Sequence, residues 1–462
     1  ILATHKILFT KDIYTSMVRY KTSSLLSLGK YSEVIVFLKK EISDIESNSI
    51  TRNQQDEISS LKNSLGLAYF YSGECSVAID ILRGVISSSN ELIDIKILLT
   101  TYHNLGIINY NISNFRTALD FFEKALTITE KSFDVVRKAI ILLNIAGINH
   151  RLGNFKSALA QYEQIENLFG SIGKIRNYEN LLLGYCLLKT NLGLIDEART
   201  LLKMAEELAL ERANNLVLAH TYALRGEIER TESKWHLALD YYDKSIEFFN
   251  KNKLIKELAQ INIYKSEVLL KMDKIEEALS VIENVKKIVG INQFPDILLR
   301  LTIQEILLNL NNDEPLHYAD INTKLNNLKT NKILNEDWET NFNFLRVIAI
   351  FKQISGSIDE SKEIILKLKN QMNRAVNGLD NNILNTFFKE SEFGKYLMDI
   401  EGKKEKSAIE RVLEINLEIT ENLNLNQVLN KILNNLLILS GADLVFLFLK
   451  NQSGDFIITS VL

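Results

Sequence analysis

The sequence predicts an all-α protein, a right-handed superhelical solenoid of helical hairpins with a short α/β segment at its C-terminal end. Three observations predict this fold: alanine recurs with a 40-residue period, constant residue types surround each alanine, and proline is nearly absent. The 462 residues include only 2 prolines and 19 glycines, so the chain lacks the turn-rich linkers that separate globular domains. We therefore expect one continuous architecture over most of the chain.

The period is visible at four positions of each repeat. The alanines are Ala78, Ala118, Ala158, Ala198, Ala238 and Ala278. The residues three places earlier are Cys75, Phe115, Phe155, Ile195, Trp235 and Ile275, and those four places later are Leu82, Phe122, Tyr162, Leu202, Tyr242 and Ile282. Turn-forming residues stand five places before each alanine: Gly73, Ser113, Gly153, Gly193, Ser233 and Asp273. Each repeat is thus predicted to be an apolar helix, a tight turn and a second, amphipathic helix.

Close packing of two helices explains the alternation of small and large residues. A small side chain lets two helix backbones approach, and large residues one turn away fill the neighbouring groove. The first helices repeat this arrangement with Leu65-Gly66, Leu105-Gly106 and Ile145-Ala146. Weaker copies lie before and after the regular repeats, at Gly29, Tyr31 and Leu38 and at Gly356, Ile358 and Ile365.

The pattern resembles the tetratricopeptide repeat family over roughly residues 14–369. The resemblance is carried by Leu105-Gly106, Phe115, Ala118, Phe122 and Ala125 and by their counterparts in neighbouring repeats. The chain departs from the family in its period, which is 40 residues instead of about 34, and in lacking the proline that often closes the second helix. A HEAT-type array has a similar period, but it does not predict this order of glycine, aromatic residue and alanine.

These patterns divide the chain into five parts. We expect a partial repeat at 1–54, six regular repeats at 55–290, degenerate helical repeats at 291–400, a linker helix at 401–425 and the start of an α/β domain at 426–462. In the linker, apolar residues alternate three and four apart, which is typical of a short coiled coil, with one asparagine at a seam position. The seam residues are Ile409, Val412, Asn416, Ile419 and Leu423. A homodimer through 406–423 is therefore expected.

The C-terminal segment, 412–462, resembles the beginning of a GAF domain. We expect a helix at 425–439 and strands at 443–450 and 455–461, joined by a Ser453-Gly454-Asp455 turn. The resemblance rests on Leu413-Glu414-Ile415-Asn416, Leu425-Asn426-Gln427-Val428-Leu429, Gly441-Ala442-Asp443 and Phe446-Leu447-Phe448-Leu449. It covers one helix and two strands of that fold, so it assigns no ligand. Such a combination implies a fragment of a large multidomain bacterial signalling or transcription-regulatory protein.

Composition and missing motifs restrict the function. The net charge of −4 gives no reason to expect binding to nucleic acid or to an anionic membrane, and residues 436–449 are too short to span a membrane. Two cysteines in apolar surroundings indicate a reducing compartment, so we expect a cytoplasmic protein. Phosphate-binding loops, zinc motifs and nucleophile motifs are absent, and the six histidines never fall at ligand spacing on one helix. We predict no enzymatic activity, no cofactor and no metal.

Binding is the remaining function, and the concave wall of the solenoid is the expected surface. The resemblance implies that one face of each first helix lines this wall. The predicted partner-binding residues are Tyr71, His103, Tyr110, Asn111, His150, Arg151 and Asn191. Beside them Leu67, Ile107 and Leu187 form an apolar floor, which Glu227 and Glu267 replace in the later repeats. Amide, cationic and aromatic groups in one groove suit an extended peptide or a partner helix.

Two functions remain open at this stage. The favoured function is a protein–protein interaction and signal-relay scaffold that binds a protein, or another domain of the parent chain, and acts on the sensory domain that follows. The alternative is a peptide-binding receptor of the quorum-sensing regulator type. A receptor should have a deep groove with convergent asparagines, whereas a scaffold can use its convex face.

Overall fold

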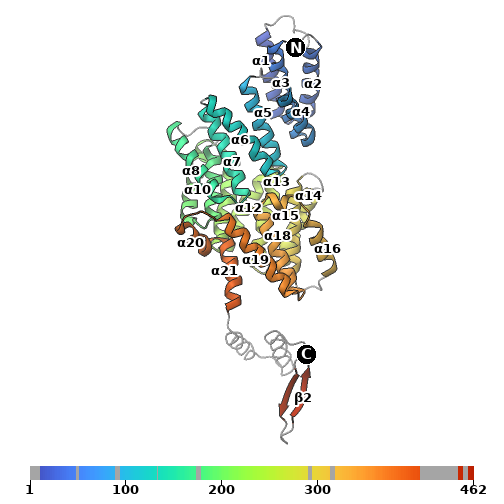
Figure 1. Ribbon diagram of the computed structural model, residues 1–462, viewed down its shortest axis with the longest axis vertical. Coiled ribbons are helices and arrows are strands. Elements are labelled where there is room, and N and C mark those ends of the chain that lie inside the picture. Colours follow the sequence, from blue (N-terminus) through green and yellow to red (C-terminus); the bar gives the residue numbers. More distant parts are fainter. Residues whose placement is uncertain are drawn as a thin grey trace. The chain divides into compact units, whose positions relative to one another are not determined.

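The structure, a computed structural model, describes residues 11–47, 51–88, 94–132, 134–172, 178–289, 294–312, 318–405, 446–450 and 456–461. The chain forms two units, residues 1–391 and 392–462. In the described part of the first unit, all regular structure is helical, and successive helices stack as antiparallel hairpins (Figure 1). The tetratricopeptide-like solenoid predicted from the period is confirmed.

The first unit begins with the hairpin α1 (Lys11–Ser27) and α2 (Tyr31–Glu46). Six regular hairpins follow: α3 (Arg52–Tyr71) with α4 (Cys75–Ser87), α5 (Ile95–Asn111) with α6 (Phe115–Ser132), α7 (Val135–Arg151) with α8 (Phe155–Ile172), α9 (Tyr178–Asn191) with α10 (Ile195–Glu211), α11 (Asn215–Thr231) with α12 (Trp235–Lys251), and α13 (Ile255–Lys271) with α14 (Ile275–Val289). The later helices are α15 (Pro295–Leu310), α16 (Tyr318–Leu328), α17 (Ile333–Glu336), α18 (Trp338–Ile354), α19 (Ile358–Ala375) and α20 (Asn381–Glu390).

The turns inside the six regular hairpins share one backbone conformation. All six turn residues lie in the left-handed region, with φ from 61° at Ser113 to 91° at Gly73. After α3, the backbone N–H of Glu74 donates to the carbonyl of Tyr69 at 2.9 Å, and the N–H of Gly73 donates to that of Phe70 at 3.0 Å. These bonds satisfy the last carbonyls of the helix and reverse the chain. Glycine, serine and aspartate recur here because the turn requires a positive φ.

The small residues of the repeat lie where two helices meet. All six alanines of the period are fully buried. In the first helices, glycine faces the large residue four places after the alanine: a Cβ added to Gly106 would lie 2.8 Å from the ring of Phe122, and one added to Gly66 would lie 2.9 Å from Leu82. The predicted contact between small and large residues is therefore confirmed.

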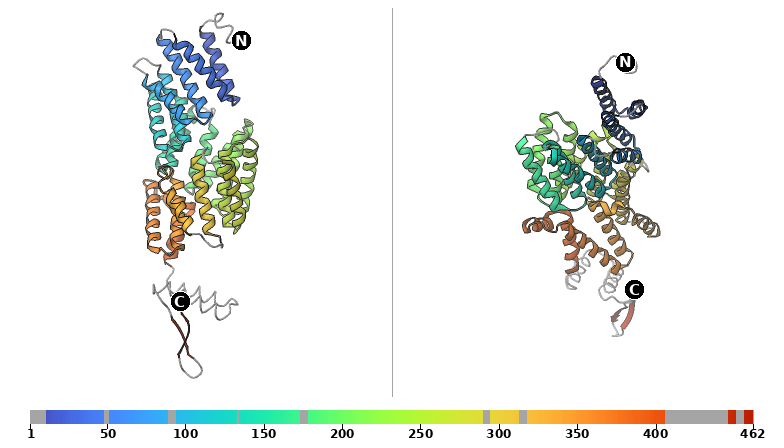
Figure 2. Two further views of the ribbon diagram at one scale, coloured as in Figure 1. Left: turned by 90° about the vertical axis from the view of Figure 1, so that its right-hand side faces the viewer. Right: turned by 45° about the horizontal axis from the view of Figure 1, so that its top comes forward.

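The solenoid of the first unit turns far enough to bring its late helices back onto its early hairpins (Figure 2). The backbone N–H of Arg116 donates to Glu336 at 2.8 Å, although 220 residues separate them. The rings of Phe155 and Trp338 lie 5.1 Å apart, and Arg151 forms an ion pair with Asp337. We call these three pairs the closure contact. No feature of the sequence predicted it.

The second unit contains α21 (Glu392–Glu405) and two strands, β1 (Phe446–Lys450) and β2 (Phe456–Val461). The strands pair antiparallel, with Phe446 opposite Val461 and Lys450 opposite Phe456. They fall within the two strands expected from the sequence. The predicted coiled-coil segment, 406–423, and the helix expected at 425–439 lie outside the described residues. None of the described helices is long and apolar enough to cross a membrane.

Candidate functional site

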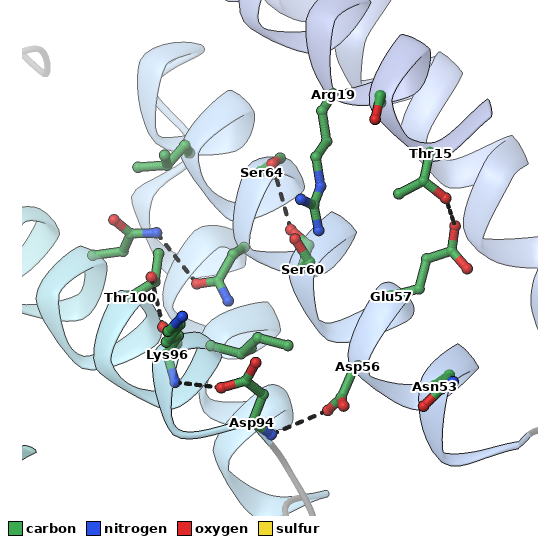
Figure 3. A pocket seen from close by; sticks show the side chains of 15 residues that line it. Thr15, Arg19, Asn53, Asp56, Glu57, Ser60, Ser64, Asp94, Lys96 and Thr100 are labelled. Atoms are coloured by element: carbon green, nitrogen blue, oxygen red, sulfur yellow. Dashed lines mark hydrogen bonds between the residues drawn. The ribbon is translucent and has the colours of Figure 1, made fainter. Parts of the chain in front are cut away.

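A groove of about 780 Å³ opens between α1, α3 and α5, the first helices of three successive hairpins (Figure 3). First helices of neighbouring hairpins contact one another, as α3 contacts α5 and α9 contacts α11, which places them in the inner layer of the solenoid. The groove is lined by Thr15, Ser16, Arg19, Asn53, Asp56, Glu57, Ser60, Asn63, Ser64, Leu67, Asp94, Lys96, Ile97, Thr100 and Asn104.

The floor of the groove is a buried network of amides. The side-chain amide of Asn63 on α3 donates to the hydroxyl of Thr101 on α5 at 2.9 Å, and that of Asn104 donates to the side-chain oxygen (Oδ1) of Asn63 at 3.2 Å. These bonds hold the two helices at fixed separation, because an unpaired amide in this position would cost free energy. The floor is therefore polar and rigid before any ligand arrives.

Charges of both signs surround the floor. Asp56 accepts the backbone N–H of Asp94 at 3.2 Å, and the side chain of Asp94 accepts the backbone N–H of Lys96 at 2.8 Å, capping α5 (Figure 3). Glu57 accepts the hydroxyl of Thr15 at 2.8 Å. The cationic side chains of Arg19 and Lys96 have no ion-pair partner among the described residues, and Arg19 extends from α1 toward Ser60 (Figure 3).

A second, smaller cavity lies one hairpin further along, between α5 and α7. Its volume is about 210 Å³, and its lining shares Thr100 with the groove. We call it the side cavity. Its lining residues are Leu99, Thr100, His103, Arg137, Ile140 and Ile141. Burial, together with the positive charge of Arg137, lowers the pKa of His103, so the imidazole is neutral at neutral pH.

Three of the predicted site residues lie at the turn ends of their helices. Tyr71 is half exposed and stacks on Tyr31 with ring centroids 5.5 Å apart. The ring of Tyr110 lies 5.4 Å from that of Phe115. The amide of Asn111 donates to the carbonyl of Ile107 in its own helix at 2.9 Å. None of these three side chains lines the groove or the side cavity.

The side chains of the other four predicted residues, His103, His150, Arg151 and Asn191, contact residues of other hairpins. The amide nitrogen of Asn191 lies 3.0 Å from Nε2 of His150, and the equivalent nitrogen of Asn144 lies 3.4 Å from Nε2 of His103. Arg151 pairs with Asp337 in the closure contact. Of the seven predicted residues, His103 alone lines one of the two described cavities, while Leu67 of the predicted floor lines the groove.

The acidic residues of the later repeats form internal ion pairs. Arg230 donates to Glu227 at 2.8 Å and to Glu267 at 3.1 Å, and Tyr242 donates to the other oxygen of Glu227. Glu227 is buried. These carboxylates, which replace the apolar floor in the later repeats, are therefore neutralised by an arginine of their own helix layer.

Sequence reasoning missed the polar residues that line the groove. Ser60 and Ser64 on α3 have counterparts 40 residues later, Thr100 and Asn104 on α5, and all four line it. They lie on the same helix face as the pair Leu67 and Ile107 but about one and two turns earlier. Extending that face toward the start of each first helix would have found them.

The described residues offer little for covalent chemistry. Burial raises the pKa of Cys186 to about 12, and burial also raises that of Cys75. Both thiols therefore stay protonated at neutral pH. No group of three or more histidine, cysteine or acidic side chains that could hold a metal occurs in the described part of the chain.

Comparison with known proteins supports the repeat architecture. Residues 97–170 match a model of the tetratricopeptide repeat. No curated protein matches the chain. Among solved structures, a Rap protein complexed with competence and sporulation factor is similar with a TM-score of 0.60 and 14% identity, covering 78% of this chain and 98% of that one.

Two further structures are similar in the same range. NprR in complex with its cognate peptide NprX has a TM-score of 0.56 and 16% identity, covering 77% of this chain and 99% of that one. The Rap conjugation gene regulator of the plasmid pLS20, in complex with the Phr* peptide, has a TM-score of 0.51 and 15% identity, covering 76% and 98%. At these identities the likeness concerns the fold.

Proposed function

We propose that this chain is a non-enzymatic interaction module that binds an extended peptide, or an extended segment of a protein, in the groove between α1, α3 and α5. The observation that carries the proposal is the groove itself, about 780 Å³ in volume with a hydrogen-bonded amide floor and charges of both signs. An extended backbone presents unpaired N–H and C=O groups, which hydroxyl and amide side chains can satisfy whatever the peptide sequence.

The groove favours the peptide-receptor alternative over a general scaffold. Its hydroxyl groups, on Ser60, Ser64 and Thr100, come from neighbouring helices and retain capacity to accept hydrogen bonds. Arg19 and Lys96 can bind carboxylates, since neither is in an ion pair among the described residues. By their descriptions, two of the similar structures reported above contain a peptide, and the third contains competence and sporulation factor.

A relay role in a larger bacterial signalling protein remains part of the proposal. The antiparallel pair β1 and β2 is compatible with the start of a GAF domain at 426–462. In that arrangement a bound peptide would bias the domain that follows the solenoid. Dimerisation through 406–423 and the cytoplasmic location stay predictions.

The test is to block the groove without disturbing the helices. Ser60→Trp places an indole in the groove, and the matched control Ser87→Trp places one on the exposed end of α4. Random twelve-residue peptides are selected by display on the wild-type chain, and the recovered sequences are titrated by calorimetry. We expect Ser60→Trp to abolish their binding and Ser87→Trp to retain it. Recovered peptides that bind both variants equally would place the site elsewhere.

A further inference from the structure

We propose that the side cavity takes the aliphatic side chain of a peptide's C-terminal residue, and that Lys96 and Arg137 bind the terminal carboxylate beside it. This inference rests on the proposed peptide binding in the groove, and it names the ligand more closely. The ligand is a short peptide with a free C-terminus and a final residue such as leucine, isoleucine or valine.

The walls of the side cavity include three aliphatic side chains. Leu99 and Ile141 are buried, and Ile140 completes the wall from α7. A volume of about 210 Å³ is several times the roughly 30 Å³ that one water occupies in the liquid, so a branched side chain of four carbons fits. Filling the cavity would remove apolar surface from water, which is favourable.

Each of the two cations lines one of the two cavities, and Thr100 lines both. Lys96 lines the groove one turn before Thr100, whose hydroxyl donates to the carbonyl of Lys96 at 2.8 Å, and Thr100 belongs to both linings. Arg137 lines the side cavity. Its Nε lies 3.2 Å from Asp134, and its guanidinium has no other partner among the described residues. A carboxylate here can therefore bind the two terminal nitrogens of Arg137.

The neighbouring imidazole adds no positive charge, because His103 is neutral at neutral pH. A neutral imidazole has one donor and one acceptor nitrogen, so His103 can form a hydrogen bond with the last peptide group of the ligand. The opposite end of the groove carries Asp56 and Glu57 on α3. First helices packed about 8–10 Å apart put α3 about 20 Å from α7, which an extended chain of about six residues spans.

The experiment uses the full chain and a hexapeptide library with free termini. In each sublibrary the C-terminal residue is fixed as leucine, isoleucine, valine, alanine, phenylalanine or lysine, and a matched set ends in carboxamides. Affinity selection with mass-spectrometric readout measures enrichment. We expect the leucine, isoleucine and valine acids to be enriched about tenfold or more over the alanine acids and over their own amides.

Four variants assign the effect to the cavity. Ile140→Trp fills it and Arg137→Gln removes the cation, so both should lose the enrichment. Ile288→Trp adds an indole at a half-exposed position of α14, and Lys138→Gln removes a charge paired with Glu130 at 3.5 Å, so both should keep it. Thermal unfolding checks that all four fold.

The outcomes separate this inference from the proposed function. Enriched hexapeptides with no preference at the C-terminus, or with the same preference in Ile140→Trp and Arg137→Gln, would overturn the inference while the groove still binds peptide. No enriched hexapeptide, together with display peptides that Ser60→Trp blocks, would likewise overturn it and leave the proposed function standing. Failure of both experiments would overturn both.

Discussion

The guanidinium of Arg151, at the end of α7, forms an ion pair with the carboxylate of Asp337, which also caps α18 by accepting the backbone N–H of Thr340 at 3.0 Å. The side chain of Asp337 is 1% exposed and that of Arg151 is 26% exposed. Arg151, which the sequence predicted to be a partner-binding residue, therefore contributes to the closure contact. The pair is the most buried charge–charge contact of the closure.

Arg151→Ala should destabilise the first unit by on the order of 2–4 kcal/mol, because it leaves Asp337 buried without its cation. Partial exposure of Arg151 to solvent reduces the value below that of a fully buried pair. The control is Arg116→Ala, whose side chain is 71% exposed and lies 3.7 Å from Glu336, and which should cost less than about 1 kcal/mol. Urea unfolding measures both, and equal costs would contradict the assigned role of Arg151.

Gly153 and Gly73 offer a matched test of the closure contact. Both have a positive φ, 79° and 91°, so alanine strains the backbone at either position by about 1–2 kcal/mol. A Cβ at Gly153 would also clash with the ring of Trp338, whereas one at Gly73 would meet nothing within 4 Å. Gly153→Ala should therefore cost about 1–3 kcal/mol more than Gly73→Ala. Chemical unfolding of the two variants gives the difference, and a difference near zero would mean that Trp338 moves away freely.

The regular hairpins were predictable because each depends on residues near in sequence. Ala118, Phe122 and Ser113 set one crossing and one turn, and the same three positions recur every 40 residues. The closure contact was not predictable in this way. Trp338 belongs to the degenerate part of the chain, and its partner Phe155 is determined by the cumulative rotation of all the intervening hairpins.

The residues predicted from the sequence and the residues that line the groove both belong to first helices, but they lie at different heights along them. Four of the residues predicted from the sequence are the last residues of their first helices, where side chains meet the turn and the next hairpin. They are Tyr71, Asn111, Arg151 and Asn191. Polar character alone could not separate a side chain such as His150, which bonds to a neighbouring helix, from one such as Ser64, which lines a groove. That distinction depends on the spacing between hairpins.

The alanine position of the repeat can be tested within a single helix. Ala158 is fully buried on α8, and Ala160 lies two residues further on and is exposed. Ala158→Phe should destabilise the fold by about 1–3 kcal/mol, because the ring must displace well-packed neighbours. Ala160→Phe controls for the change in helix propensity and should cost under about 0.5 kcal/mol. Thermal unfolding midpoints decide the matter, and an unchanged midpoint for Ala158→Phe would show that the helix register is wrong.

His150 should make stability depend on pH. Burial, with a smaller contribution from Arg151, lowers the pKa of His150 from 6.5 to about 4, while Asp337 acts in the opposite direction. At pH values well above 6.5 the imidazole is neutral in both the folded and the unfolded state and has no effect on stability. As the pH falls from 6.5 to 4, the unfolded chain binds a proton that the folded chain does not, so folding loses up to about 3 kcal/mol. His150→Asn removes the titrating group and should flatten this part of the profile. Urea unfolding at pH 7.5, 6.5, 5.5 and 4.5 compares the two proteins: the gap between wild type and variant should narrow steadily toward acid pH, and a constant gap would show that His150 does not titrate as a buried neutral imidazole.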